Sequence, residues 1–306
     1  MLGRTDLAIE CREMFAEEIA GVESTEKVSD GIRVTHIKIV DEEGSSKIGK
    51  PIGNYVTIEI DSMDFENDEA VKRGSEAVCE ELKKLINTEK NLSVLVVGLG
   101  NRYITPDSVG PKAADKIFVT RHLHELKEMQ FDFDFRPVSA VSPGVLGLTG
   151  IETGEIVFGI KERIKPDIII AVDALASRSL TRLGTTVQIA DTGINPGSGV
   201  GNNRKELSEK SLGVKVIAIG VPMVVDAAAM VEETLEAIKS HSPQNAVSEG
   251  MKNIDEKQRF NIINEALKKE GTNMIVTPNN VDIISSQAAQ IIAEGINKAL
   301  HADIFD

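Results

Sequence analysis

The sequence has few of the residues that mark several large classes of protein. Among its 306 residues it contains two cysteines and no tryptophan, and aromatic residues make up only 4%. Cys11 and Cys79 are too few and too unpatterned for a disulfide framework, a zinc site or a redox pair of closely spaced cysteines. A buried core built from this composition must consist mainly of Val, Ile, Leu and Ala.

Positive charge and long apolar runs are equally scarce. The chain carries 34 Lys and Arg against 48 Asp and Glu, which gives a net charge of −14. A nucleic-acid surface needs a basic field to displace phosphate counterions, so we expect no nucleic-acid partner. No run approaches the roughly 18 apolar residues of a membrane span, and the N-terminus lacks the apolar region of a secretory signal. We therefore expect an intracellular protein without membrane attachment.

The apolar runs that are present predict a sheet covered by helices. An amphipathic helix at 6–20 precedes two strand-like runs, at 32–40 and 54–60, which a Gly/Ser/Lys loop connects. The later runs are short and almost wholly apolar, which is typical of parallel strands buried on both faces. They lie at 92–98, 138–141, 167–172, 186–190, 214–220 and 273–277. Helical patterns lie at 67–87, 108–128, 154–165, 224–240, 256–270 and 281–300.

Together these patterns predict the architecture of the chain. We expect a three-layer α/β/α domain with a mostly parallel central sheet, plus an N-terminal helix and strand pair. The core of this domain is expected at about 90–300. The polar run at about 241–256 is expected to be an irregular excursion.

Three motifs resemble nucleotide or metal sites and fail on closer inspection. Residues 44–50, GSSKIGK, have the spacing of a phosphate-binding loop, but Pro51 stands where that loop needs Ser or Thr. Residues 96–103, VVGLGNRY, have the first two glycines of a dinucleotide-binding fingerprint, but Tyr103 stands where the third is needed. Residues 122–128, HLHELKE, lack the second histidine of a zinc-protease helix. We expect a hairpin loop at the first motif and a solvated helix face at the last.

The loop at 189–203, IADTGINPGSGVGNN, combines an acidic triplet with a run of glycines. Asp191, Thr192 and Gly193 form the triplet that carries the carboxylates of pepsin-like proteases. A pepsin-type site needs two such triplets that face each other across an all-β cleft. This triplet occurs once, in a chain of α/β pattern, and is weak support for such a site.

Two other carboxylates lie where an open parallel sheet places its functional sites, beyond the carboxyl ends of the strands. Asp173 directly ends the apolar run DIIIAVD, and Asp107 lies in the loop that follows the run at 92–98. Asp107 also precedes a predicted helix, so capping that helix is its alternative role. Both residues are candidates for function.

Four long segments then carry a resemblance to a known family. They are VVGLGNRYITPDSVGPKAAD, VSPGVLGLTGIETGEIV, AVDALASRSLTRLGTTVQIADTGINPGSGVGNNR and VIAIGVPMVVDA. These segments resemble the germination proteases, the endopeptidases of spore-forming bacteria, and the resemblance extends from Arg4 to the C-terminal helix. The fold of that family is similar to that of the hydrogenase maturation endopeptidases. Their glycine-rich loop is matched by Gly98, Gly100, Asn101, Asp107 and Gly110.

The resemblance implies an atypical aspartic protease that uses neither metal nor cofactor. Its catalytic pair would be Asp107 and Asp173, with Asp191 a candidate assisting acid in a loop that shapes the cleft wall. In the hydrogenase relatives the acids bind metal and a histidine assists, whereas no histidine lies near the strand ends here. A metal-dependent peptidase on the same scaffold is the alternative.

The two acids would divide the chemistry between them. Two carboxyls that share a site resist ionising together, so their pKa values separate. We expect Asp107, near a helix N-terminus, to be the ionised base because the helix dipole lowers its pKa. Asp173, which emerges from an apolar strand, is then the protonated acid.

The resemblance also implies a substrate, an assembly and a location. The substrates would be small acid-soluble spore proteins, cut after Glu or Asp and before a hydrophobic residue followed by Ala. The enzyme would be a homotetramer in the cytoplasm of the developing spore and in the spore core. Because arginine matches a carboxylate with two hydrogen bonds, we expect substrate-binding arginines among those in the motif loops. These are Arg102, Arg178, Arg182 and Arg204.

The N-terminus contains a copy of that cleavage pattern. Asp6, Leu7 and Ala8 form the order acid, hydrophobic residue, alanine. Family members are zymogens that remove a short propeptide themselves, so we predict a propeptide at 1–6 and a single peptidase domain at 7–306. The alternative role of Asp6 is a helix cap. Gly3 stands where protein substrates carry an acid, so we expect the cut between Asp6 and Leu7 to be slow.

Overall fold

The computed structural model describes residues 5–61, 68–86, 92–125, 136–195, 206–241, 250, 254–267 and 274–305. Its strands are β1 (Val22–Ser29), β2 (Ile32–Ile39), β3 (Gly53–Ile60), β4 (Val94–Gly98), β5 (Val138–Val141), β6 (Ile168–Ser177), β7 (Thr186–Ala190), β8 (Lys215–Asp226) and β9 (Ile275–Val276).

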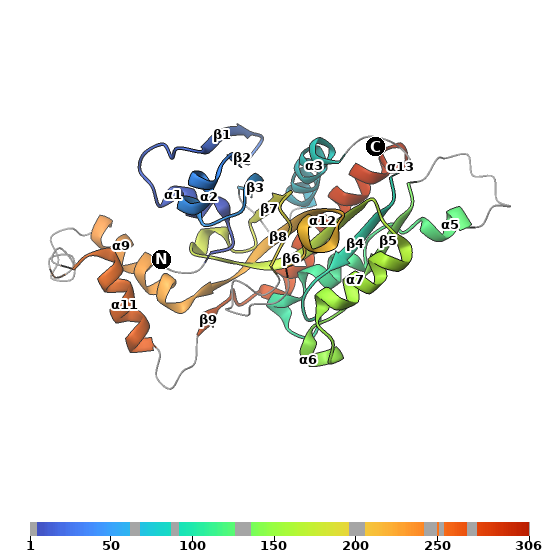
Figure 1. Cartoon of the computed structure of the whole chain (residues 1–306). Coiled ribbons are helices and arrows are strands. Elements are labelled where there is room, and N and C mark those ends of the chain that lie inside the picture. The colour runs from blue at the N-terminus through green and yellow to red at the C-terminus, as the bar shows by residue number, and fades with distance from the viewer. Residues whose placement is uncertain are drawn as a thin grey trace.

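The helices precede, follow and connect these strands, and α9 and α11 extend together from one end of the molecule (Figure 1). They are α1 (Ala8–Glu13), α2 (Glu42–Ile48), α3 (Asp68–Leu85), α4 (Val109–Ala114), α5 (Arg121–Glu125), α6 (Leu146–Thr149), α7 (Thr153–Ile164), α8 (Glu209–Leu212), α9 (Ala227–His241), α11 (Glu256–Leu267), α12 (Val281–Leu300) and α13 (Ala302–Phe305). Two 3-10 turns, η1 (Thr105–Asp107) and η2 (Leu180–Arg182), follow β4 and β6. None of the described helices is long and apolar enough to cross a membrane.

The described strands form one mixed sheet, whereas the sequence predicts a mostly parallel one. Their order is β1-β2-β3-β7-β8-β6-β4-β5, with β9 paired to β8. Strands β5, β4, β6 and β8 run parallel and form the parallel half of the sheet. Strands β1, β2, β3 and β7 pair antiparallel, as do β7 with β8 and β9 with β8, and the first four form the antiparallel wing.

The predicted direction of β7 is wrong for a physical reason. All residues of β7 are buried, because the strand lies inside the sheet between β3 and β8 and is covered on both faces. An apolar run therefore reports burial, and burial on both faces does not fix whether a strand is parallel to its neighbours.

Helices cover both faces of the parallel half. On one face α3, α4 and α12 pack against even-numbered residues of β4 and β6, such as Val96 and Ile170. On the other face α7 and α8 pack against odd-numbered residues, such as Val97 and Ile169. Because side chains alternate along a strand, Asp173 of β6 lies on the α7 and α8 face.

The antiparallel wing has a smaller core of its own. Helices α1 and α2 pack there against β2 and β3, and the fully buried Leu7 belongs to this cluster together with Ile37 and Tyr55. Leu175 of β6 joins the same cluster. Since Leu175 is two residues beyond Asp173 along β6, the two side chains share a face, and the core of the wing lies on the same face of the sheet as Asp173.

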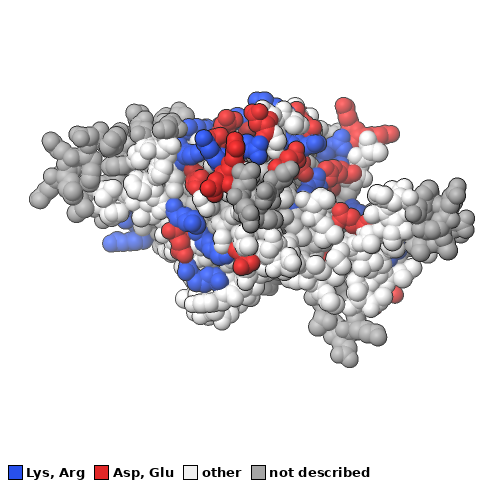
Figure 2. Space-filling model, turned by 180° about the vertical axis from the view of Figure 1, so that it is seen from behind, with Lys and Arg blue, Asp and Glu red and all other residues white. Residues whose placement is uncertain are grey.

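The outer strand β1 has no counterpart in the sequence-based prediction. Nearly all of its residues are exposed, so its sequence VESTEKVS has no apolar pattern to detect. Ion pairs join it to β2, with Glu23 at 3.8 Å from Lys38 and Glu26 at 3.5 Å from Arg33. Figure 2 shows acidic and basic side chains intermixed over the upper part of the molecule. Charges of this kind protect an edge strand from pairing with other chains.

Helix α2 replaces the hairpin loop that was expected at residues 44–50. Asp41 begins the helix by accepting a hydrogen bond from the backbone N–H of Gly44 at 2.8 Å. Gly49, with a φ of 72°, ends it in the left-handed conformation that glycine adopts most easily. The segment nevertheless joins two antiparallel strands, which excludes the strand-to-helix geometry of a phosphate-binding loop.

The other helices agree with the sequence to different degrees. Helix α12 has the predicted bounds 281–300, whereas the predicted helix at 6–20 is confined to α1. The predicted helix at 108–128 is interrupted and gives α4 and α5. The run at about 241–256 lies mostly outside the described residues.

Candidate active site

Asp173 lies in β6 at the point where its neighbour β4 ends. The last paired residue of β4, Gly98, lies opposite Val172, so Asp173 is the first residue of β6 beyond that strand. Only 5% of Asp173 is exposed. One carboxylate oxygen accepts a hydrogen bond from the backbone N–H of Ala174 at 2.9 Å. Asp173 is therefore a buried carboxyl at the carboxyl end of the parallel half.

Asp107 ends the 3-10 turn η1 in the loop after β4, and it is partly exposed. Its carboxylate accepts a hydrogen bond from the backbone N–H of Asn101 at 2.8 Å, while the capping position of α4 belongs to Ser108. Gly100 makes this turn possible, because its φ is 109° and a Cβ there would meet the backbone oxygen of Asp107 at 2.2 Å.

Two further glycines bring the loop of Asp107 against the strand of Asp173. A Cβ on Gly110 of α4 would lie 2.2 Å from the backbone oxygen of Leu99 and 2.4 Å from that of Val172. A Cβ on Gly98 would lie 2.2 Å from the oxygen of Gly110. The start of α4 therefore packs directly against the ends of β4 and β6, and η1 contacts β6 and β8. The fold gathers the two predicted acids at one edge of the sheet.

Asp191 is hydrogen-bonded to Asn54 at the start of β3. Its carboxylate accepts hydrogen bonds from the backbone N–H of Asn54 at 2.8 Å and from the side-chain amide of Asn54 at 2.6 Å. Its backbone N–H donates to the oxygen of Asn54 at 3.2 Å. Asp191 thus ties the loop after β7 to the start of β3, and these bonds engage both of its carboxylate oxygens.

Arg182 is held by acids of the protein itself. Its guanidinium donates to both carboxylate oxygens of Glu13, at 2.7 and 2.6 Å, and to Glu59 at 3.0 Å, and it lies 3.5 Å from Glu10. Burial lowers the pKa of Arg182, but the bonds to Glu13 and Glu59 outweigh burial and raise that pKa overall. The arrangement fastens α1 to η2 and β3.

The other predicted substrate-binding arginines are placed differently. Arg102 is exposed and lies 3.4 Å from Asp115. The backbone N–H of Arg178 donates to the buried Glu10 at 2.7 Å. Arg204 lies outside the described residues. The structure thus gives Arg182 an anchoring contact and leaves Arg102 at the surface.

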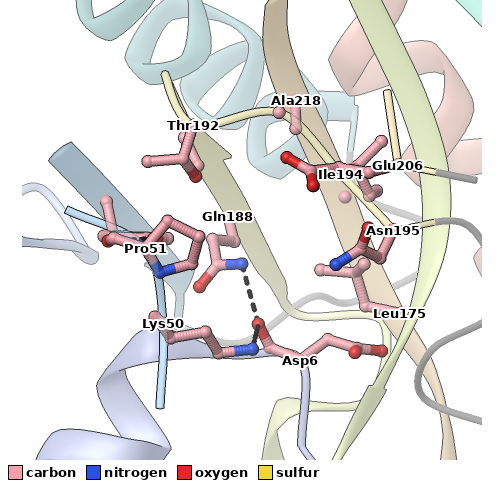
Figure 3. Close-up of a pocket in the computed structure, with 14 residues that line it drawn as sticks. Asp6, Lys50, Pro51, Leu175, Gln188, Thr192, Ile194, Asn195, Glu206 and Ala218 are labelled. Carbon is pink, nitrogen blue, oxygen red and sulfur yellow. Dashed lines mark hydrogen bonds between the residues drawn. The ribbon is translucent and has the colours of Figure 1, made fainter. Parts of the chain in front are cut away.

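The N-terminal segment forms one wall of a groove on the wing. We call it the N-terminal groove; it lies between Asp6 on one side and the loop after β7 on the other (Figure 3). Its wall includes Lys50, Asn195 and Glu206, and the side chains of Lys50 and Gln188 point toward Asp6. The loop at 189–203 therefore frames this groove as far as Asn195, beyond which it lies outside the described residues.

The segment in the groove is held through its backbone and its acid. The backbone N–H of Asp6 donates to the oxygen of Ala176 in β6 at 2.9 Å, and the N–H of Ala176 donates to the carboxylate of Asp6 at 2.8 Å. The backbone oxygen of Asp6 accepts from Lys50 Nζ and from Gln188 Nε2, both at 3.0 Å. Leu7 and Ala8 are fully buried. The predicted processing site is thus docked inside the molecule.

The floor of the groove connects it to Asp173. Gln188 of β7 lies opposite Gly220 of β8, and Gly220 lies opposite Asp173 of β6. Paired residues point to the same face of a sheet, so the side chains of Gln188 and Asp173 lie on one face with a glycine between them. The side chain of Leu175 lies over Gly220, because a Cβ there would be only 2.5 Å from it.

Sequence reasoning missed Lys50 and Gln188. Lys50 belongs to a false phosphate-binding motif, and its partner Asp6 is far away in the sequence. Gln188 could have been noticed in the sequence, because it is a polar residue inside the apolar run at 186–190. The described residues bring together no group of three or more His, Cys, Asp or Glu that could hold a metal ion.

Comparison with known proteins agrees with the sequence motifs. A family model described as germination protease matches residues 5–252 and 244–306. Germination proteases of Caldanaerobacter subterraneus subsp. tengcongensis and Clostridium acetobutylicum are each 45% identical, over 97% of this chain and 94% of theirs. That of Priestia megaterium is 40% identical over 98% of this chain and 94% of its own.

One solved structure is also similar. It is a [NiFe] hydrogenase maturation protease, HycI, from Thermococcus kodakarensis, with 21% identity and a TM-score of 0.30. The match covers 47% of this chain and 80% of that one.

Proposed function

This chain belongs to the germination protease family and is an endopeptidase, and from that premise we propose that it cuts itself and then small acid-soluble spore proteins during germination. The cut falls after Glu or Asp and before a hydrophobic residue followed by Ala. We further propose a homotetramer that acts in the cytoplasm of the developing spore and in the spore core.

The proposed mechanism uses Asp107 and Asp173 as a pair of general acid and base. One observation carries this proposal: the close approach of Gly110 to Leu99 and Val172 seats the loop of Asp107 beside the strand of Asp173. Each acid accepts a backbone N–H, from Asn101 and from Ala174, and Asp173 is the more buried of the two, so we assign Asp107 as the base and Asp173 as the acid. Asp107 takes a proton from water, and Asp173 gives a proton to the leaving amine.

Asp191 has a different part in this proposal. Its bonds to Asn54 support a role in holding the cleft wall, since both of its oxygens are engaged there. The processing site supports the self-cleavage, because Asp6 lines the N-terminal groove and Leu7 and Ala8 are buried beside it in the core of the wing, on the same face of the sheet as Asp173. We therefore propose residues 1–6 as the propeptide and Leu7 as the first residue of the mature chain.

The test is to map the cuts made by the full chain, with and without EDTA. The chain is allowed to process itself and is then incubated with a small acid-soluble spore protein, and the new termini are identified by mass spectrometry. A matched substrate has Gln or Asn in place of each Glu or Asp that precedes a cut. We expect cuts after Glu or Asp that persist in EDTA and disappear in the matched substrate.

Two other outcomes would change the proposal. Cutting that stops in EDTA and returns with a transition metal would support the metal-dependent alternative, with the aspartates as ligands. Absence of any cut in the chain or in the substrate would contradict the proposed substrate and self-processing.

A further inference from the structure

The carbonyl oxygen of Asp6 belongs to the peptide bond that the proposed function cuts, and two side chains donate to it. We propose that Lys50 and Gln188 form the oxyanion-binding pair of this enzyme, for its own processing site and for the equivalent bond of its substrates. This inference rests on the proposed function, because it requires the bond between Asp6 and Leu7 to be a site of cleavage.

The geometry at the Asp6 oxygen supports the assignment. Lys50 Nζ and Gln188 Nε2 each donate at 3.0 Å, and they come from different elements, one after α2 and the other in β7 (Figure 3). Donors fixed at this distance stabilise the negative charge that develops on a carbonyl oxygen during hydrolysis. One of the two donors is a cation, which strengthens its hydrogen bond as that charge grows.

The bond is held on both of its sides by the same residue. While the Gln188 amide donates to the oxygen of Asp6, its own carbonyl oxygen accepts from the backbone N–H of Ala8 at 2.7 Å. The hydrogen bonds between Asp6 and Ala176 fix the acidic side of the bond, and the complete burial of Leu7 fixes the other. The scissile carbonyl therefore has little freedom to turn away from its donors.

Gln188 also lies on the same face of the sheet as Asp173, one of the proposed acids. Gln188, Gly220 and Asp173 lie opposite one another on neighbouring strands. Two strand spacings separate Gln188 from Asp173, about 10 Å between backbones. The side chain of Leu175 lies over Gly220, where a Cβ would meet it at 2.5 Å, so the proposed step requires Leu175 to move aside before water reaches the carbonyl.

In the proposed step, water attacks the carbonyl carbon of Asp6 while Asp107 takes the water proton. The electron pair of the C=O bond moves onto the oxygen, where Lys50 and Gln188 hold the charge. When the C=O bond re-forms, the bond to the Leu7 nitrogen breaks and that nitrogen takes the proton of Asp173. The products are a carboxylic acid at Asp6 and an amine at Leu7.

The test measures the first-order rate of self-cleavage in the full chain by intact mass. Gln188→Glu keeps the acceptor for Ala8 but loses the donor, and Lys50→Met keeps the apolar stem but loses the charge. We expect each to slow the cut about 10²–10³-fold, the usual effect of removing one oxyanion donor. Lys50→Arg should recover part of the rate. The control is Lys47→Met, which removes an exposed lysine of α2 that bonds to Glu43, and it should cut at the normal rate.

A second readout separates catalysis from simple loss of docking. An added unrelated protease reports whether the segment at Asp6 has left the groove. Slow cutting with the segment still protected supports the inference. Normal rates in Lys50→Met and Gln188→Glu would overturn it, and so would slow cutting accompanied by a released segment. Failure of the proposed function is recognised separately: the unaltered chain then makes no cut between Asp6 and Leu7. If the unaltered chain cuts there and both variants cut at the same rate, only the oxyanion pair is wrong.

Discussion

The parallel half and the antiparallel wing of the sheet contribute different residues to the proposed function. The parallel half supplies Asp107 and Asp173, which reach one edge because parallel strands end together and glycines let α4 approach. The wing supplies Lys50, Gln188 and the bound N-terminal segment, which is far from them in sequence. In the proposed function the first region carries out the proton transfers and the second holds the peptide.

The largest effect should follow from a change in the parallel half. Asp173→Asn and Asp107→Asn each remove a group that transfers a proton, so we expect self-cleavage to slow by about 10²–10⁴-fold. Asp167→Asn is the matched control at the opposite end of β6, where Asp167 accepts hydrogen bonds from Ser93 and an amide oxygen can replace the carboxylate. Intact mass over time gives the rates.

Asp191→Asn tests whether the catalytic acids belong to the parallel half of the sheet or to the antiparallel wing. If Asp191→Asn abolishes cutting and Asp173→Asn does not, the chemistry belongs to the wing and the division between the two regions is wrong. We expect Asp191→Asn to cut, because an asparagine oxygen still accepts from the backbone N–H of Asn54.

The second effect concerns how α1 and the segment before it are held. Arg182→Met leaves the buried Glu10 and the carboxylates of Glu13 and Glu59 without their shared cation. We expect the free energy of unfolding to fall by roughly 3 kcal/mol, the cost of breaking a largely buried ion pair. Chemical denaturation measures it.

Arg102 provides the control for Arg182, since both arginines were predicted to bind substrate. Arg102 is exposed and 3.4 Å from Asp115, so Arg102→Met should change the free energy of unfolding by at most about 1 kcal/mol. A stable Arg182→Met variant that no longer prefers acidic residues in a spore-protein substrate would restore the substrate-binding role and contradict the anchoring one.

The two regions also differ in how far the sequence predicts them. Asp107 and Asp173 could be proposed from the rule that sites follow the carboxyl ends of buried strands. The wing could not, because an exposed strand such as β1 has no apolar period and burial does not reveal the direction of β7. The groove depends on contacts between Asp6, Lys50 and Gln188, and no local pattern encodes contacts between distant segments.

The smallest effect is a pH dependence of the free energy of unfolding that arises from Tyr55 in the wing. Burial raises the pKa of Tyr55 to about 12, with Asp191 adding to the rise and Thr192 opposing it, and the hydroxyl donates to the oxygen of Pro51 at 2.8 Å. Between about pH 10 and about pH 12 the unfolded chain loses this proton while the folded chain keeps it, so stability falls as pH rises, by roughly 2–3 kcal/mol at most.

Tyr55→Phe should remove this part of the pH dependence, so the stability advantage of the unaltered chain over the variant should shrink across that interval. Urea unfolding at a series of pH values from about 9 to about 12 measures the difference. Tyr103→Phe is the control, because Tyr103 is 78% exposed. A difference between the unaltered chain and Tyr55→Phe that stays constant with pH would mean that the hydroxyl ionises as readily in the folded groove as in water. The groove at Tyr55 would then be wet, and water could stabilise the charge on the Asp6 carbonyl in addition to Lys50 and Gln188.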